Sequence, residues 1–299
     1  MTVLVVGAGI AGLACARELV DAGIPARVVE RDPVVGGRLA SEHLDGRFTD
    51  IGAAYLTADD PAFRGRLDSW RIAGLARPWT DTLLAFDGAG SRPHPTTGPV
   101  RWSAPGGLRG LAEDLARELD LTLGCEITSL PPGTDPVVLA MPGPQARLLT
   151  AMAAAREQSW SPVLTAVLTY PERVWADFRG AFVNDHPVLA TLCDDGDRRG
   201  DRAPVLVAHS TAAFAQPHLA DPAAAADDLA TAAGELLRIN EKPRVYVRRW
   251  TWAQPEPRDG LFAQEGNVYL AGDAFGRPRV QTAWLSGRAV ARAIIRGAR

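Results

Sequence analysis

The chain has 299 residues, of which 46% are hydrophobic and 22% are charged, so it has the composition of a globular protein with room for two domains. Its net charge is -3 and its basic residues form no long block, which excludes nucleic acid as an expected partner. The three cysteines, Cys15, Cys125 and Cys193, follow no disulfide or metal-ligand spacing, so no metal is expected. No apolar run reaches the ~18 residues of a membrane span, and we expect a cytoplasmic protein without a membrane partner.

The first predicted element is a buried strand over 3–6, which is short, apolar and β-branched. Three glycines follow in the spacing G-x-G-x-x-G, and the helix after them has an apolar face that ends at Gly23. A second strand over 26–30 ends on an acid, Glu30. This order of strand, turn, helix and strand is the dinucleotide-binding fingerprint.

Each residue type of this turn has a physical reason. Gly7 permits the tight turn, Gly9 lets the backbone approach a pyrophosphate, and Gly12 lets the helix pack closely on the strand. The first helical turn, Ile10 and Ala11, offers free N–H groups to the phosphates. Glu30 is expected to accept hydrogen bonds from a ribose diol and to disfavour NADP, so the turn is expected to hold NAD or FAD.

The middle of the chain divides into two patterns. A helix over 108–119, a strand over 121–130 and a buried strand over 136–142 are expected to join the nucleotide domain. The runs 163–172, 181–194, 204–212 and 244–253 are rich in Val, Thr and aromatic residues and predict an antiparallel sheet. An amphipathic helix over 222–239 is expected to pack on that sheet, and the loop 195–203 is expected to be solvated.

The end of the chain repeats the pattern of a ligand-binding turn. A short apolar strand over 267–271 leads directly into Gly272 and Asp273. After the loop 276–282, a helix is expected over 283–296, and its N-terminus is suited to stabilising negative charge.

The sequence resembles a known superfamily. E-R-D-P-V-V-G-G-R at 30–38 and the Gly272-Asp273 segment are similar to the FAD proteins of the glutathione reductase and amine oxidase type. D-I-G-A-A-Y-L-T-A-D-D-P-A-F at 50–63 and R-R-W-T-W-A-Q-P at 248–255 resemble the bacterial renalase-like branch of the amine oxidase superfamily, as does G-D-A-F-G-R-P-R-V-Q-T-A-W-L-S-G at 272–287. This resemblance covers nearly the whole chain.

The resemblance implies an FAD that is bound without a covalent link, because the C-terminal flavin segment contains no cysteine. It places the pyrophosphate, ribityl chain and flavin against several further segments, and the adenine near Ile127. The implied cofactor residues beyond the first turn are Arg31, Gly37, Arg38, Gly52, Ala53, Gly272, Asp273, Val280, Gln281 and Ala283.

The implied fold class is α/β, with a Rossmann-type FAD-binding domain and an inserted α+β substrate domain built on an antiparallel sheet. The FAD-binding domain is expected to be discontinuous, over 1–58, 100–156 and 256–299. The substrate domain is expected over 59–99 and 157–255.

Three functions stay open from the sequence. Renalase-like enzymes oxidise misreduced isomers of NAD(P)H and pass the electrons to dioxygen. The second possibility is a flavin oxidase or dehydrogenase acting on another small substrate, such as an amine, for which Lys242 is the single lysine available to bind water at the flavin. The third is a flavin protein without turnover. Hydride transfer from a dihydropyridine needs positioning more than acid–base help, and the expected contributors are Tyr55, Thr57, His209 and Trp284, with Trp160 and Trp250 also available.

The chain departs from the branch at two places. Position 54 is Ala where the branch usually has Gln, and positions 281 and 282 are Gln-Thr where it usually has Glu-Gly. The resemblance places both departures near the flavin and substrate, so Gln281 is expected to face the ligand.

Overall fold

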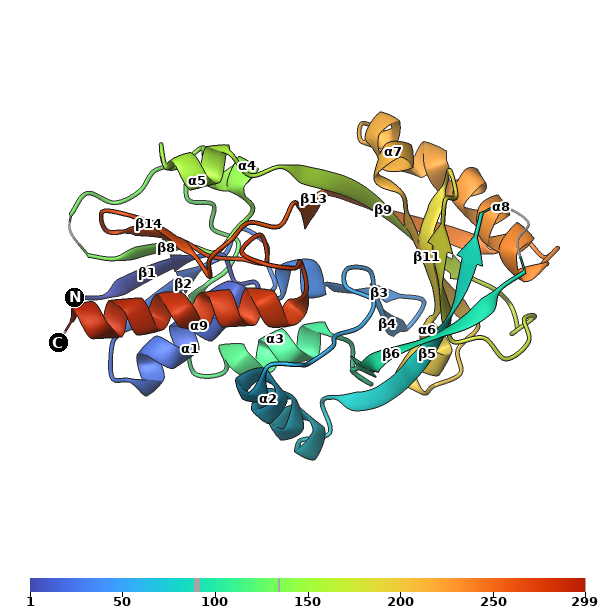
Figure 1. Cartoon of the computed structure of the whole chain (residues 1–299), viewed down its shortest axis with the longest axis horizontal. Helices are drawn as coiled ribbons and strands as arrows, with labels where there is room; N and C mark the ends of the chain where they lie inside the picture. Colours follow the sequence, from blue (N-terminus) through green and yellow to red (C-terminus); the bar gives the residue numbers. More distant parts are fainter. Residues whose placement is uncertain (89–91, 134, 299) are drawn as a thin grey trace.

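A computed structural model of the chain describes residues 1–88, 92–133 and 135–298. Figure 1 shows one sheet with α1 and α9 at the end of the molecule that holds both termini, and a second sheet with α8 at the other end. The described helices are too short or too polar to span a membrane.

The first sheet has six strands in the order β14-β15-β8-β1-β2-β7. Its pairs are parallel except for the β14–β15 hairpin. The expected strand, helix and strand at the start of the chain are confirmed, and so is the return of the last strand to the same sheet. The strands are β1 (Val3–Val6), β2 (Ala26–Val29), β7 (Asp120–Thr122), β8 (Val137–Leu139), β14 (Ala263–Glu265) and β15 (Val268–Leu270).

Helices cover this sheet and share its hydrophobic core. The buried faces of α1 and α9 pack against one another, and Gly287 of α9 lies against the carbonyl of Ala11 so closely that a Cβ would not fit. The α9 helix begins three residues earlier than the sequence predicts. The helices are α1 (Ile10–Asp21), α2 (Pro61–Ile72), α3 (Arg109–Ala116), α4 (Gly143–Ala146), α5 (Ala153–Arg156) and α9 (Val280–Gly297), with a 3-10 turn at Gly37–Leu39.

The second sheet has seven strands in the order β13-β9-β12-β11-β10-β5-β6, and only β10 and β5 pair in parallel. The predicted antiparallel sheet is therefore present. The run 181–194 is two strands, because the chain turns at Asp185, whose φ is 50°. The strands are β5 (Arg77–Asp87), β6 (His94–Ser103), β9 (Trp160–Thr169), β10 (Gly180–Asn184), β11 (Leu189–Asp194), β12 (Val205–Ser210) and β13 (Arg244–Pro255).

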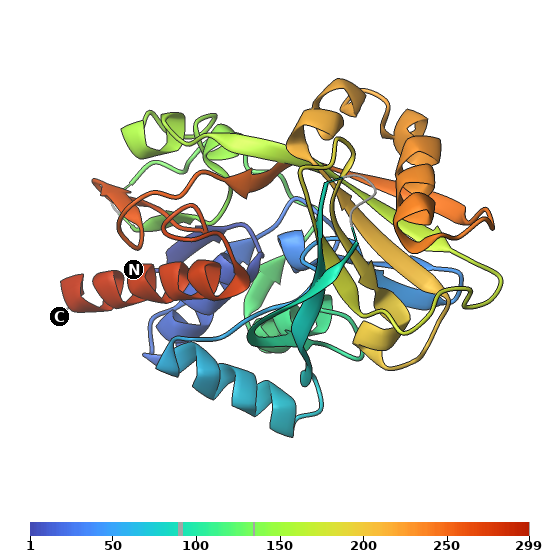
Figure 2. The ribbon, with the colours of Figure 1, turned by 45° about the vertical axis from the view of Figure 1, so that its right-hand side comes forward.

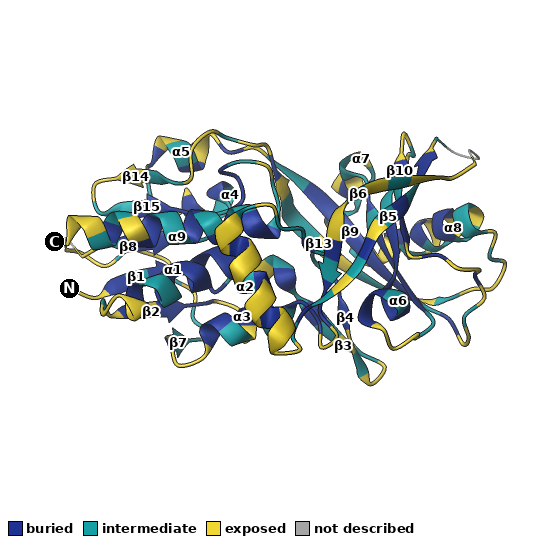
Figure 3. Cartoon of the chain, turned by 60° about the horizontal axis from the view of Figure 1, so that its bottom comes forward, coloured by how far each residue is buried: buried dark blue, intermediate teal, exposed yellow. Residues whose placement is uncertain are grey.

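One face of the second sheet packs against α8 through a separate hydrophobic core. Figure 2 shows α8 lying along the outer side of this sheet, and Figure 3 shows that the helix turns its buried residues towards the strands. The predicted helix over 222–239 is thus confirmed, with a 3-10 turn at its start. The elements are α6 (Asp195–Arg199), α7 (Ala212–Ala215), α8 (Ala226–Leu237) and the 3-10 turns Gln216–His218 and Pro222–Ala225.

A short hairpin, β3 (Ser41–Leu44) and β4 (Arg47–Asp50), connects the two sheets. Its Leu44 and the following Ile51 pack against Val167, Val205 and Val207 of the second sheet. The division into domains stays a proposal. We note that α2, which the division gives to the substrate domain, buries Phe63, Leu67 and Trp70 in the core of the first sheet.

Two expectations about the elements of the fold were wrong. The predicted strand over 121–130 ends at Thr122, because Gly124 turns the chain with a φ of 66° and Cys125 donates to the carbonyl of Glu30. The predicted solvated loop 195–203 instead begins with α6, whose Asp195 and Arg198 are fully buried.

Candidate functional site

A continuous cavity of about 1710 Å³ runs from the carboxyl ends of β1 and β2 to the inner face of the second sheet. Pockets for drug-sized ligands usually measure about 300–1,000 Å³. The cavity is therefore large enough for an extended cofactor together with a substrate. The carboxyl edge of a parallel sheet is also where doubly wound α/β proteins bind their ligands.

Two helices begin at this cavity with free backbone donors. Neither α1, which starts after Gly9, nor α9, which starts after Arg279, has a side-chain cap or an acid in its first turn. A Cβ built on Gly9 meets no atom within 4 Å, so the backbone there is open to the cavity. Exposed N–H groups at a helix N-terminus bind anions such as a pyrophosphate. The residues present therefore fit a phosphate-containing cofactor such as FAD.

Glu30 is fixed at the end of β2. Its carboxylate accepts hydrogen bonds from the backbone N–H of Ala8 at 2.7 Å and of Asp32 at 3.0 Å, and its exposed fraction is 9%. The side chain lines the cavity, so its remaining lone pairs are available to a ligand. A ribose diol as that ligand stays a prediction.

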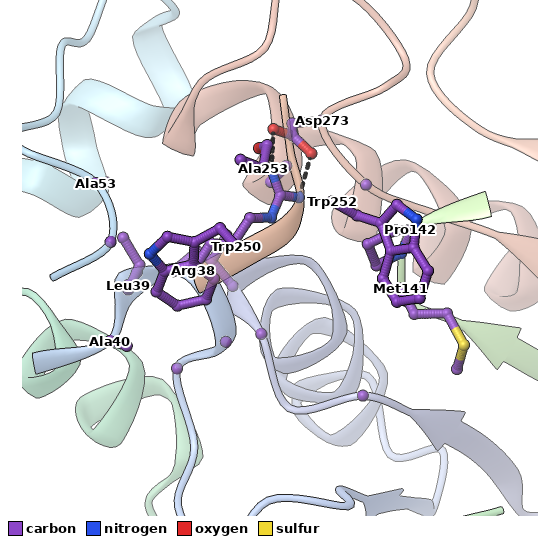
Figure 4. A pocket seen from close by; sticks show the side chains of 18 of the residues that line it. Arg38, Leu39, Ala40, Ala53, Met141, Pro142, Trp250, Trp252, Ala253 and Asp273 are labelled. Carbon is purple, nitrogen blue, oxygen red and sulfur yellow. Dashed lines mark hydrogen bonds and ion pairs between the residues drawn. The ribbon is translucent and has the colours of Figure 1, made fainter. Parts of the chain in front are cut away.

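Arg38 and Asp273 join the two cofactor segments. The guanidinium donates to both carboxylate oxygens, at 2.5 and 2.7 Å, and also to the carbonyl of Ala253. Figure 4 shows this pair between Trp250 and Trp252 among the residues that line the cavity. The Arg38 guanidinium also lies 4.9 Å from the ring centroid of Trp160. Because Asp273 balances the charge of Arg38, this arginine is held in place before any phosphate binds.

The segment 50–57, of which residues 52–57 line the cavity, rests on a buried ionic cluster. Arg198 of α6 donates to the carbonyl of Ala54 and to the carboxylate of Asp195, and its other neighbour is Asp50 at 3.7 Å. Asp50 in turn accepts from Ser41 at 2.5 Å and from the backbone N–H of Leu108 at 2.8 Å. Buried charges of this kind are stable only when they are paired, which explains why the charged run 195–199 is inside the molecule.

His209 lies between the two walls of the cavity. Its Nε2 is 3.0 Å from the carbonyl of Gly52, and its Nδ1 is 2.9 Å from Thr191 Oγ1. Since a carbonyl only accepts, Nε2 carries the proton and Nδ1 accepts from the threonine. Burial lowers the pKa of His209 to about 4, with a further contribution from Arg198. His209 is thus a neutral positioning group at physiological pH.

Tyr55 is the aromatic residue of the 50–57 segment. Burial raises its pKa above the ordinary value, and the Arg101 guanidinium lies 5.4 Å from its ring centroid. The phenol is therefore uncharged and suited to packing against a ligand ring rather than to acting as a base.

Most residues predicted from the sequence come together around the cavity. Gly12 does not line it, because it serves the packing of α1 on Gly7 that the fingerprint requires. The predicted residues that do line it are Gly7, Gly9, Ile10, Ala11, Glu30, Arg31, Gly37, Arg38, Gly52, Ala53, Tyr55, Thr57, Ile127, His209, Gly272, Asp273, Val280 and Ala283.

The structure corrects the expectation for Trp284. Its side chain is 4% exposed and packs between Phe63, at 5.3 Å between ring centroids, and Arg288, at 4.4 Å. It belongs to the core between α2 and α9 and does not line the cavity. The helical spacing that identified it marks the buried face of α9.

The expectation that Gln281 faces the ligand is also wrong. Its Oε1 accepts from the backbone N–H groups of Asp59 and Asp60 at 2.8 and 3.0 Å, and its Nε2 donates to Asp59 Oδ1 at 2.5 Å. The side chain fastens the segment before α2 to the start of α9. The departure from the branch at 281 and 282 therefore does not change the cavity surface, whereas Ala54 does line it.

Sequence reasoning missed several cavity residues on the second sheet, including Thr165, Thr191 and Arg248. Alternation along β9, β11 and β13 could have assigned them to one face, but the choice of face requires the strand pairing. Lys242 is exposed, precedes β13 and does not line the cavity. The amine oxidase variant that depends on this lysine therefore loses support.

Comparisons with known families agree with this geometry. The profile described as flavin containing amine oxidoreductase matches residues 83–295, and the profile described as NAD(P)-binding Rossmann-like domain matches residues 5–70. Together these matches include both cofactor segments.

Individual relatives match only a short part of the chain. Putrescine oxidase of Kocuria rosea is 44% identical over 66 residues, which are 22% of this chain and 14% of that protein. Phytoene dehydrogenase of Streptomyces griseus is 48% identical over 58 residues, which are 19% of this chain and 11% of that protein. These similarities leave most of each relative unmatched.

Solved structures share the fold over the whole chain. Wild-type putrescine oxidase bound to putrescine superposes with a TM-score of 0.76 at 17% identity, covering 100% of this chain and 99% of that chain. A protoporphyrinogen oxidase candidate from Exiguobacterium sp. 255-15 superposes with a TM-score of 0.77 at 15% identity, covering 99% of each chain.

Proposed function

The chain belongs to the flavin containing amine oxidoreductase family and is an FAD-dependent oxidoreductase; on that premise we propose that it oxidises a dihydronicotinamide, as renalase-like enzymes do, with dioxygen as the electron acceptor. Bound FAD supplies the two-electron oxidation chemistry, and the chain supplies position and exclusion of water.

One observation carries this proposal. The second sheet forms the substrate wall, and none of the residues that its described strands contribute to the cavity is a carboxylate. A cationic amine held against this wall would find no counter-ion on these strands, and an unpaired charge in a partly dry site is unfavourable. A dihydronicotinamide ring is uncharged and suits a wall built from aromatic and hydroxyl side chains.

The neutral state of the polar residues supports the same substrate class. His209 has both ring nitrogens in hydrogen bonds and a pKa of about 4, so it is poorly suited to remove a proton from an amine. A donor that is already a dihydropyridine gives up a hydride without a general base. Trp160, Trp250 and Tyr55 line the cavity and provide flat surfaces against which such a ring can stack.

The decisive experiment is anaerobic mixing of the oxidised protein with candidate donors while the flavin absorbance is recorded. The panel contains 2- and 6-dihydroNAD(P), ordinary NAD(P)H and several primary amines. We expect fast bleaching by a dihydro isomer and slow bleaching by ordinary NADH. Rapid reduction by an amine alone would select an amine oxidase instead, and reoxidation by air then tests dioxygen as the acceptor.

The link to FAD is tested on the same preparation. We propose that it is noncovalent, since Cys125 is the one cysteine among the described cavity residues and lies beside Ile127, at the end where adenine is expected. Acid precipitation should leave all of the flavin in the supernatant. Flavin that stays with the pellet would contradict a noncovalent link.

A further inference from the structure

A row of polar side chains crosses the inner face of the second sheet. Thr165 of β9 pairs directly with His209 of β12, and His209 pairs with Thr191 of β11. Arg248 of β13 pairs with Thr165 on the other side. Directly paired residues of neighbouring strands point to the same face, and all four line the cavity.

The rows on both sides of this polar row are apolar or aromatic. On one side Tyr246, Val167, Val207 and Cys193 lie across the same four strands. On the other side Val163 pairs with Trp250. The polar row is thus a narrow strip of hydrogen-bonding side chains. A ligand in the cavity would contact it between two apolar rows.

The interior of the row is uncharged. His209 uses both ring nitrogens within the protein, as described above. The Thr165 hydroxyl is buried and has no hydrogen-bond partner among the residues that the structure describes. A buried hydroxyl without a partner is unfavourable, so a ligand group or a water that reaches it would be stabilised.

The charge of the row is at its β13 end. The Arg248 guanidinium lies 5.4 Å from the ring centroid of Trp250, whose indole N–H is fixed by the carbonyl of Ile51 at 2.9 Å. In the described part of the chain, Arg248 forms no ion pair within 4.0 Å. Glu42 of the β3 strand is a carboxylate that also lines the cavity.

We propose that Arg248 is a specificity-determining residue that selects substrates carrying an anionic group and rejects cationic amines, while the neutral part of the row contacts the uncharged reacting end. This proposal deepens the proposed function and rests on it, because it concerns the same cavity. A phosphate or a carboxylate is the class of group that a guanidinium on an aromatic platform binds.

The test measures binding to the oxidised holoenzyme by the change in flavin absorption. Three probes share a phenyl ring and a three-carbon chain and differ only in their end group: 3-phenylpropionate, 3-phenylpropanamide and 3-phenylpropylamine. The wild-type protein is expected to bind the anion most tightly and the cation most weakly. Arg248→Gln should weaken the binding of the anionic probe about tenfold, which is the usual effect of losing one partly screened charge pair. The affinity for the neutral amide should not change.

Two variants act as controls. Arg244→Gln removes a cation from the same strand and the same face, but Arg244 pairs with Asp45 at 2.7 Å and does not line the cavity, so this variant should bind all three probes like the wild type. Glu42→Gln removes a negative charge from the cavity wall and should tighten the binding of the anionic probe. Unchanged FAD content in every variant shows that the fold is intact.

The outcomes separate the two proposals. Tightest binding of the amine by the wild type, or an equal loss for all three probes in Arg248→Gln, overturns the role of Arg248. The probes are not dihydronicotinamides, so this result stands whether or not a dihydronicotinamide reduces the flavin. A second outcome is that no dihydronicotinamide reduces the flavin, although the wild type still binds the anionic probe most tightly and the cationic probe most weakly. In that case the proposed function fails and the preference for an anionic substrate remains.

Discussion

Arg38 and Asp273 are 235 residues apart in the sequence, and they form a two-point ion pair in the wall of the cavity. Asp273 is buried, whereas Arg38 is about one-third exposed on the cavity side. The pair thus joins the N-terminal and C-terminal cofactor segments and holds the guanidinium in one orientation.

Asp273→Asn should weaken this connection. The variant keeps the shape but removes the charge, so one charge-assisted hydrogen bond is lost and Arg38 is left without its counter-ion. We expect the free energy of unfolding to fall by about 2 kcal/mol and FAD to bind more weakly. Chemical denaturation and FAD titration measure both effects. Asp201→Asn, at an exposed ion pair with Arg47, is the control and should change neither by much. Equal effects in the two variants would argue against a special role for Asp273.

Glu30→Gln tests the nucleotide end of the cavity. The carboxylate accepts from two backbone N–H groups, and an amide can replace only one of these acceptors while its own N–H₂ faces a donor. We expect the dissociation constant of FAD to rise about tenfold. Asp32→Asn changes an exposed carboxylate on the same wall and should have a smaller effect. Unchanged FAD affinity in Glu30→Gln would place the ribose elsewhere.

Gln281→Glu tests the correction at the start of α9. The new carboxylate would stand against the Asp59 carboxylate in place of a hydrogen bond, so the free energy of unfolding should fall by about 1 kcal/mol. The pKa of Asp59, which is lowered chiefly by Arg279 and then by Gln281, should rise. Adding Asp59→Asn should restore the stability. The flavin midpoint potential should not change, and a clear decrease would show that residue 281 faces the flavin after all.

His209 predicts a pH dependence of stability. Burial lowers its pKa from 6.5 to about 4, so the unfolded chain binds the proton more readily than the folded chain between these values. Stability is therefore full above pH 6.5 and is lost as the pH falls towards 4, by up to about 3 kcal/mol. His209→Gln should remove this part of the slope, whereas His43→Gln, at an exposed histidine, should keep it. The test is to measure the free energy of unfolding from pH 7 to pH 4 for each variant. Parallel curves for the wild type and His209→Gln would contradict the assignment of this pH dependence to His209.

The cofactor side of the molecule could be predicted from the sequence because its signals are local. The first turn, the acid at Glu30 and the strand before Gly272 each depend on a few neighbouring residues whose conformations follow from residue type. The antiparallel sheet could be predicted for the same reason, since each strand is recognised from the pattern of its own residues.

The errors concern residues whose partners are distant in the sequence. The run at 195–199 has the composition of a solvated loop, and it is buried only because Asp50, Arg47 and Ala54 provide partners for its charges. Trp284 and Gln281 follow the same logic, because their neighbours Phe63 and Asp59 lie more than 200 positions away. The polar row depends on the register between neighbouring strands, which cannot be predicted from the sequence of any one strand.

The order of strands in the first sheet has a consequence for how the protein is made. β8 lies between β1, at the start of the chain, and β15, close to its end, and α1 packs on α9. Contacts at such separations form slowly, because the intervening chain must first be ordered. Until residues 268–273 have been synthesised, β8 has an open edge and the Arg38 guanidinium lacks its partner Asp273. The cofactor site can therefore form only after residues 268–273 have been synthesised, and until then the growing chain has an exposed strand edge of the kind that favours aggregation.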